Sequence, residues 1–270
     1  MHKRAARARR VAGQLGAKGV VGVAVAMLAW LACLPTIASA APSNPYIGTG
    51  YDASYPNCNA AQPPTGASFG LIGVGGGRAF TSNSCAASEV TAAQSLTIKP
   101  SLYYNTGYAG SFARQIDSTC AGYVANAGGV FGKLSGHKLS QAQQAWEIGC
   151  SEASYAANYA STSTSIGFSD PASWWADVET GNSWSTNTSL NQFALDGMSY
   201  FMSTEGVGGF YSSPSMWAKI TGSSSWDTTP PMSGSWVAGT SSCSGAALGG
   251  TGAWLVQGGL NGGLDQDTAC

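Results

Sequence analysis

The chain has 270 residues, of which twelve are Lys or Arg, thirteen are Asp or Glu and two are His, and only 9% are charged. Half of the basic residues and none of the acids fall in positions 1–40, so the remaining part carries six basic against thirteen acidic side chains, a net charge of −7. An acidic chain without a basic cluster excludes nucleic acid as an expected partner. Abundant Gly, Ser, Thr, Asn and aromatic residues are typical of secreted, sugar-handling proteins.

Residues 1–40 have the pattern of a secretory signal peptide. Basic residues precede an apolar run over 19–34, and small residues at 37–40 form an A-x-A cleavage pattern before Ala41. The alternative is a retained membrane anchor, but the apolar run is a little short to span a bilayer. We therefore expect an exported protein without stable membrane insertion after cleavage, either extracellular or associated with the cell wall, in which residues 41–270 form one domain.

Six cysteines follow the cleavage site, which in an oxidising compartment predicts three disulfides. Their even spacing favours sequential pairs over the other connectivities: Cys58–Cys85, Cys120–Cys150 and Cys243–Cys270. Free buried cysteines and metal ligands are the alternatives. Because no C-x-x-C motif occurs and His137 is the only histidine after the cleavage site, we expect neither a zinc site nor a histidine-based catalytic triad.

A glycine-rich turn at 73–78 invites comparison with nucleotide-binding loops. The dinucleotide fingerprint would need a third glycine where Arg78 stands, and no Gly-Lys-Ser/Thr follows. We interpret the segment as a tight turn that leaves a strand. No cofactor is expected.

Strand-like and helix-like segments alternate along the chain. Strands are predicted at 46–52, 69–75, 98–104, 174–179, 207–212, 234–239 and 253–257, with a short eighth at 264–267. Helices are predicted at 88–96, 141–159 and 189–204, and a short one begins at Pro214. This alternation predicts a single-domain (β/α)₈ TIM-like barrel held by disulfides, and fits it better than an open doubly wound sheet.

The segment Trp174–Glu179 contains two carboxylates, Asp177 and Glu179, spaced two residues apart. On a strand they share one face, with α-carbons roughly 6.5 to 7 Å apart, while Val178 points to the other face. Paired carboxylates beside aromatic residues are what glycoside hydrolysis requires. Trp184 and Tyr104 are candidates to stack on sugar rings. The alternative for the pair is a solvated acidic turn that ends an edge strand.

Active sites of such barrels lie at the carboxyl ends of the strands. Four acids stand at predicted strand ends: Asp52, Asp177, Glu179 and Asp265. Asp52 and Asp265 would also become neighbours when the first and last strands close the barrel. We therefore expect the four carboxylates to converge at one mouth of the barrel.

Several short motifs together resemble a known family. Residues 50–54 (GYDAS) are similar to the G-I-D-V-S opening of the family 25 glycoside hydrolases, the Chalaropsis-type N-acetylmuramidases, and residues 177–179 (DVE) match their D-x-E strand. Residues 209–212 (GFYS) resemble their G-x-Y-(S/T) strand. Gln257 and residues 263–267 (GLDQD) resemble the closing W-Q-Y…V-D-x-N, although the aromatic residues beside the glutamine are missing and Asp267 replaces the asparagine.

This resemblance implies a role for each matching residue. Glu179 would be the general acid and Asp177 its carboxylate partner, while the other matching groups would line the groove: Asp52, Asp265, Tyr211 and Gln257. The favoured hypothesis is a secreted, monomeric, muramidase-like hydrolase that acts on peptidoglycan. The alternative is an inactive barrel that only binds cell-wall glycan, and the altered closing motif is the observation in its favour.

Overall fold

The computed structural model describes residues 42–58, 62–127, 129–167 and 169–270. Residues Ala41–Cys270 form one compact unit. The predicted signal peptide at 1–40 lies outside the described residues. Among the helices that the model describes, none is both long and apolar enough to cross a membrane.

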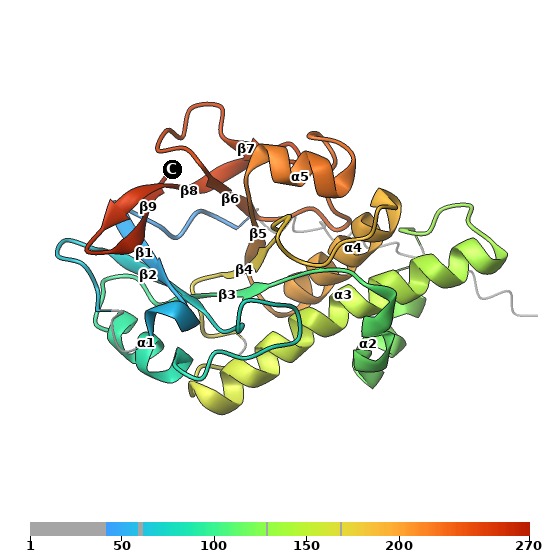
Figure 1. Cartoon of the computed structure of the whole chain (residues 1–270), viewed down its shortest axis with the longest axis horizontal. Helices are drawn as coiled ribbons and strands as arrows, with labels where there is room; N and C mark the ends of the chain where they lie inside the picture. The colour runs from blue at the N-terminus through green and yellow to red at the C-terminus, as the bar shows by residue number, and fades with distance from the viewer. Residues whose placement is uncertain (1–41, 59–61, 128, 168) are drawn as a thin grey trace, which may run out of the picture. The chain divides into compact units, whose positions relative to one another are not determined.

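Eight strands close into a barrel, as the sequence predicts (Figure 1). In order around the barrel they are β1 (Thr49–Ala53), β2 (Phe69–Gly73), β3 (Ser101–Asn105), β4 (Trp174–Asp177), β5 (Gly208–Ser212), β6 (Gly234–Ala238), β8 (Thr251–Asn261) and β9 (Leu264–Ala269). Neighbours are parallel from β1 to β6 and from β6 to β8. A two-residue strand, β7 (Ala247–Leu248), pairs with β8.

The last strand departs from strict (β/α)₈ order, because β9 runs antiparallel to both β8 and β1. Gly262 and Gly263 connect β8 to β9 with positive φ angles of 65° and 87°. Glycine takes such angles without a steric penalty, and so short a hairpin leaves no room for a crossover helix. Because β9 is reversed, its beginning rather than its end lies at the mouth where β1 ends.

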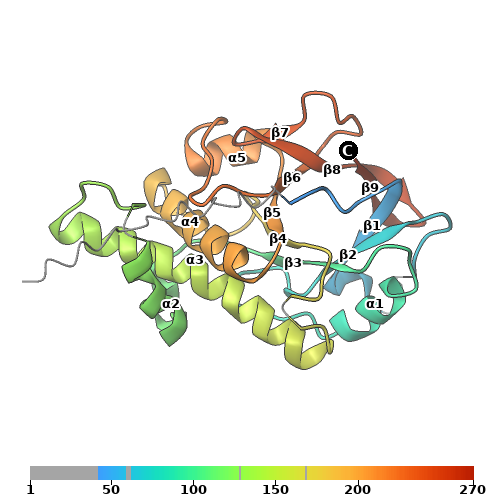
Figure 2. The ribbon, with the colours of Figure 1, turned by 180° about the vertical axis from the view of Figure 1, so that it is seen from behind.

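Five α-helices are described: α1 (Ala86–Ala93), α2 (Ser118–Tyr123), α3 (Gly136–Ser163), α4 (Thr188–Glu205) and α5 (Pro214–Thr221). The predicted helices are all present, and α3 is longer than expected. Figures 1 and 2 show α3 and α4 side by side along the outside of β3, β4 and β5. A Cβ atom on Gly149 would lie 1.8 Å from the Ala194 carbonyl oxygen, so glycine is required where these two helices cross.

The barrel has two separate apolar layers. The interior holds Tyr46, Phe69, Leu71, Tyr103, Trp175, Trp236 and Leu255. A larger cluster, which includes Trp174, Val178 and Tyr104, fills the space between the strands and the outer helices. Since successive side chains of a strand point to opposite faces, Trp174 and Trp175 are both buried but on opposite sides of the barrel wall.

All three predicted disulfides are confirmed. Cys58–Cys85, Cys120–Cys150 and Cys243–Cys270 have Cα–Cα distances of 5.5, 5.7 and 5.5 Å. They join, in turn, the segment after β1 to the start of α1, α2 to α3, and the loop before β7 to the C-terminus.

Candidate active site

A cavity of about 330 Å³ opens at the barrel mouth where the parallel strands end. Its lining includes Asp52, Asp177, Glu179, Tyr211, Gln257 and Asp265. We call it the carboxylate cavity. Six of the eight residues named from the sequence therefore lie around one space, on strands that are far apart in the sequence. Ser54, Pro56, Asn57, Tyr103, Asn105 and Trp236 complete its lining.

Strand register explains why these side chains meet. Asn105, Asp177, Tyr211 and Trp236 are consecutive register partners across β3, β4, β5 and β6. Partners in register point to the same face, so the four side chains form one row at the mouth. On the opposite side of the barrel Asp52 is the partner of Asp265 in the antiparallel pair of β1 and β9.

Asp177 is the last residue of β4, and Glu179 follows just beyond it. The Val178 amide donates to the Tyr211 carbonyl (2.9 Å) and the Val178 carbonyl accepts from the Ser212 hydroxyl (2.7 Å). These bonds continue the strand pairing, and Val178 is fully buried in the outer layer. Asp177 and Glu179 both line the cavity, so the expected alternation holds past the end of the strand.

Asn105 fixes the position of the Asp177 carboxylate. Its Nδ2 donates to Asp177 Oδ2 (2.5 Å), and its Oδ1 accepts from the Gly77 amide (2.9 Å). Because the Gly77 N–H can only donate, the amide group of Asn105 has one possible orientation, with its NH₂ toward the acid. Asp177 is 4% exposed, and its Oδ1 has no hydrogen-bond partner among the described residues.

A second chain of hydrogen bonds orients Asp52. The Tyr211 hydroxyl donates to Gln257 Oε1 (2.7 Å), and Gln257 Nε2 donates to Asp52 Oδ2 (2.8 Å). The glutamine thus connects the two sides of the mouth. Beneath it, Asp267 is fully buried and accepts a hydrogen bond from Trp236 Nε1 (2.7 Å).

Burial and mutual repulsion raise the pKa of these acids. Burial raises the pKa of Asp52 to about 7, the hydrogen bond from Gln257 opposes this, and the neighbouring Asp265 adds to it. Burial and then the charge of Glu179 hold the pKa of Asp177 well above its usual range. Burial also raises the pKa of Glu179. None of the described residues that line the cavity is basic, so the acids cannot all ionise near neutrality.

Two of the predicted aromatic contacts lie elsewhere. Tyr104 is 3% exposed and packs in the outer layer, because it follows Tyr103 on β3 and points to the opposite face. It therefore does not reach the cavity, contrary to our expectation, whereas Tyr103 does. Trp184 lines an adjacent cavity of about 260 Å³, and its Nε1 donates to the Glu179 carbonyl (2.8 Å). Trp184 therefore fixes the backbone of Glu179 and does not line the carboxylate cavity.

Asn105 and Trp236 were not predicted as site residues. Asn105 ends β3, and Trp236 lies on β6 in register with Tyr211. A polar residue that ends a predicted barrel strand was the available signal for Asn105. Trp236 had none, because its place depends on the register between strands.

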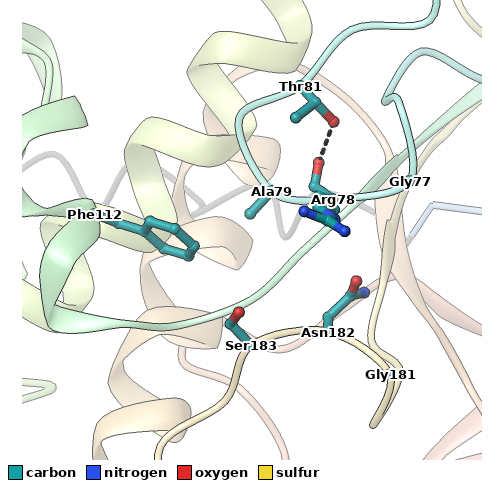
Figure 3. A pocket seen from close by; sticks show the side chains of 8 residues that line it. All are labelled: Gly77, Arg78, Ala79, Thr81, Phe112, Gly181, Asn182 and Ser183. Atoms are coloured by element: carbon teal, nitrogen blue, oxygen red, sulfur yellow. Dashed lines mark hydrogen bonds between the residues drawn. The ribbon is translucent and has the colours of Figure 1, made fainter.

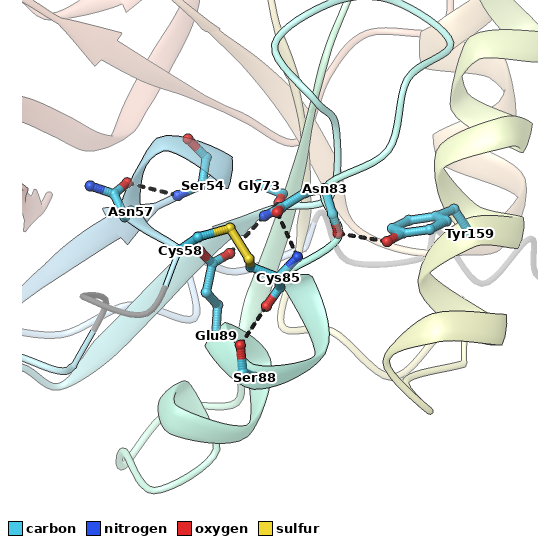
Figure 4. Close-up of a disulfide and its surroundings, with 9 residues drawn as sticks. All are labelled: Ser54, Asn57, Cys58, Gly73, Asn83, Cys85, Ser88, Glu89 and Tyr159. Carbon is cyan, nitrogen blue, oxygen red and sulfur yellow. Dashed lines mark hydrogen bonds between the residues drawn. A yellow bond between two sulfur atoms is a disulfide. The ribbon is translucent and has the colours of Figure 1, made fainter.

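One wall of the cavity is anchored by the first disulfide (Figure 4). Cys58 follows the short helix η1 (Tyr55–Asn57), where the Ser54 amide donates to Asn57 Oδ1 (3.0 Å). On the other side of the disulfide, Asn83 donates to the Gly73 carbonyl (2.7 Å) and to Glu89 Oε2 (2.7 Å). The loops after β1 and β2 are therefore fixed to each other where they border the site.

The site can supply protonated and ionised carboxyl groups together. In the described part of the chain, no group of three or more His, Cys, Asp or Glu side chains is arranged to hold a metal ion. What the arrangement provides is proton transfer by a carboxylic acid beside carboxylates that can stabilise positive charge.

Comparisons with known proteins give limited similarity. No family model matches the sequence, and no curated protein matches it. Among solved structures, the chain is similar to the modular autolysin LytC from Streptococcus pneumoniae, determined in complex with a synthetic peptidoglycan ligand, with a TM-score of 0.45 and 10% sequence identity. The alignment covers 82% of this chain and 46% of that one, so the present chain spans about half the length of the autolysin.

Proposed function

We propose that the protein is a secreted glycoside hydrolase of muramidase type, which cleaves β-glycosidic bonds in cell-wall glycan. The observation that carries the proposal is the carboxylate cavity, in which Asp52, Asp177, Glu179 and Asp265 share one opening at the barrel mouth. Glycosidases need one carboxylic acid to protonate the leaving oxygen and a second carboxylate near the sugar carbon that becomes positively charged.

Glu179 is the proposed general acid. It lines the cavity, and the Trp184 indole and the Asn182 amide both donate to its backbone carbonyl, at 2.8 and 3.1 Å. Its raised pKa favours the protonated form that a proton donor requires. When the proton passes to the leaving oxygen, a negative charge forms on Glu179 as positive charge develops on the sugar.

Asp177 is the proposed partner that faces the developing positive charge. Asn105 and the buried strand end hold its carboxylate in one position. Asp52, oriented by Gln257, and Asp265 add negative potential on the other side of the mouth. A preorganised group of carboxylates stabilises an oxocarbenium-like centre without rearranging in the reaction.

A binding-only barrel is the second candidate. The observation in its favour is Asp267, which is fully buried and bonded to Trp236, at a place where the resemblance calls for asparagine. Burial and then the charge of Asp52 hold the pKa of Asp267 well above its usual range, which favours a protonated, hydrogen-bonded group over an ionised one.

The test is incubation of the purified protein with purified cell-wall glycan, with new reducing ends counted over time. The hydrolase proposal predicts a steady release of reducing ends by the wild type. Sedimentation of the protein with the glycan, without any release of reducing ends, would instead support the binding-only barrel.

A further inference from the structure

A second cavity, of about 430 Å³, lies beside the carboxylate cavity and has a different chemistry. Two loops and one aromatic residue enclose it: residues 77–81 after β2, residues 181–183 after β4, and Phe112 (Figure 3). Arg78 extends into the space between the loops, toward Asn182 and Ser183. We call it the arginine cavity.

The two cavities are connected through shared structure. Asn105, which holds Asp177 in the carboxylate cavity, accepts a hydrogen bond from the Gly77 amide in the wall of the arginine cavity (2.9 Å). Glu179 lines the first cavity, and Gly181 lines the second two residues later. The two cavities therefore border the same two segments of chain, one at Gly77 and the other at residues 179–181.

The walls of the arginine cavity are held in place. The Thr81 hydroxyl donates to the Arg78 carbonyl (2.7 Å) and accepts from the Gly76 amide (3.0 Å), which closes the loop after β2 on itself. The opposite wall is fixed where the Tyr108 amide donates to the Ser183 carbonyl (2.6 Å). Gly107 allows this approach, since a Cβ atom there would lie 2.7 Å from the same oxygen.

Charge distinguishes the two cavities. Among the described residues that line them, Arg78 is the only basic one, and none of those that line the arginine cavity is a carboxylate. The carboxylate cavity repels an anionic group, whereas a guanidinium binds a carboxylate through paired hydrogen bonds. Asn182 and Ser183 add polar groups, and Phe112 provides an apolar wall.

From this arrangement we propose that the arginine cavity binds a carboxylate-bearing substituent of the glycan, while the neutral sugar to be cleaved lies at Glu179. This rests on the proposed function and adds a substrate requirement to it: an acidic substituent near the scissile bond. Phe112 would contact the apolar part of the same substituent.

The experiment uses two soluble cell-wall glycan fragments that differ only in whether the substituent ends in a carboxylate or a carboxamide. Binding of each fragment to the purified protein is measured by calorimetry, and cleavage is measured by reducing ends. The variants are Arg78→Gln and, as a matched control for loss of an exposed basic residue, Lys99→Gln. Lys99 precedes β3 and so lies toward the opposite end of the barrel.

The wild type should bind the carboxylate fragment about tenfold more tightly than the carboxamide. This factor is at the low end of what a hydrogen bond to a charged group contributes, because Arg78 is exposed and solvent weakens the interaction. Arg78→Gln should reduce this ratio to about one with little change for the carboxamide, and Lys99→Gln should keep it. The preference should also weaken as salt is added.

Equal binding of both fragments by the wild type, or a full preference in Arg78→Gln, would overturn the inference. Cleavage without the preference would leave the hydrolase proposal standing and refute the arginine cavity. A preference for the carboxylate fragment without cleavage would support the arginine cavity and refute the hydrolase proposal. If neither fragment binds or is cleaved, both are refuted.

Discussion

Replacing Asp52 with asparagine should stabilise the protein at alkaline pH and leave its stability unchanged in acid. Burial raises the pKa of this carboxyl from 3.8 to about 7 in the folded state. Asparagine has nearly the same size and keeps an oxygen that can accept the hydrogen bond from Gln257 Nε2. The substitution thus removes the charge and little else.

The magnitude follows from the pKa difference. Each pKa unit corresponds to about 1.4 kcal/mol, so a shift of about three units costs the folded wild type roughly 4 kcal/mol once Asp52 is ionised. The folded pKa lies above the unfolded one, so the penalty begins as the pH rises past the unfolded value and is complete above about pH 7. Below pH 4 both states are protonated and the penalty disappears. Asp52 is only partly buried, so solvent screening should bring the gain to between about 2 and 4 kcal/mol.

Urea unfolding of wild type and Asp52→Asn at pH 4 and pH 8 measures this difference. We expect similar free energies of unfolding at pH 4 and a more stable variant at pH 8. A gain of the same size at both pH values would mean that charge is not the cause. A less stable variant at pH 8 would refute the reasoning, because it would show that the ionised Asp52 is a favourable group in the folded state.

Three further predictions test other parts of the structure. Asp177→Asn should lower turnover about 10²-fold or more, because it removes the carboxylate that is proposed to face the positive charge of the transition state; an unchanged rate would contradict this. Replacing both cysteines of the Cys58–Cys85 disulfide with alanine should lower the free energy of unfolding in urea by roughly 3 to 4 kcal/mol, as expected for a loop of 27 residues. An unchanged unfolding midpoint would contradict this estimate. Gly149→Ala should lower the free energy of unfolding by about 1–3 kcal/mol or more, because the added Cβ would meet the Ala194 carbonyl. Gly122→Ala, with open space around it, is the control and should show no such loss. Equal effects would show that the α3–α4 crossing tolerates a methyl group.

The sequence predicts the barrel well because its strands are short apolar runs between glycines and turns. The segment Phe69–Gly73 is buried at every position, which is what a parallel strand covered on both faces requires. The pattern of apolar runs and turns does not predict that β9 runs antiparallel to its neighbours. It depends on the two glycines at 262–263, which allow a hairpin as readily as a loop.

The site was predictable where it depends on one strand and not where it depends on several. The spacing of Asp177 and Glu179 is enough to put both on one face. By contrast, Tyr103 and Tyr104 are equally good candidates in the sequence, and only the pairing of β3 with β4 decides that Tyr103 faces the cavity. Trp236 belongs to the site for the same reason, through its register with Tyr211.

The proposed role of Glu179 can be tested with a single substitution. Glu179→Gln keeps the size of the side chain and its capacity for hydrogen bonding but removes the acidic proton. Glu147→Gln on α3, away from the carboxylate cavity, is the matched control and should release reducing ends from cell-wall glycan at the wild-type rate.

Counting reducing ends released from cell-wall glycan by wild type and Glu179→Gln is the most direct measurement. If Glu179 donates the proton, the rate should fall about 10² to 10⁴-fold in the variant while glycan binding is retained. If wild type and Glu179→Gln release reducing ends at the same rate, Glu179 is not the general acid, and the carboxylate cavity does not act as proposed.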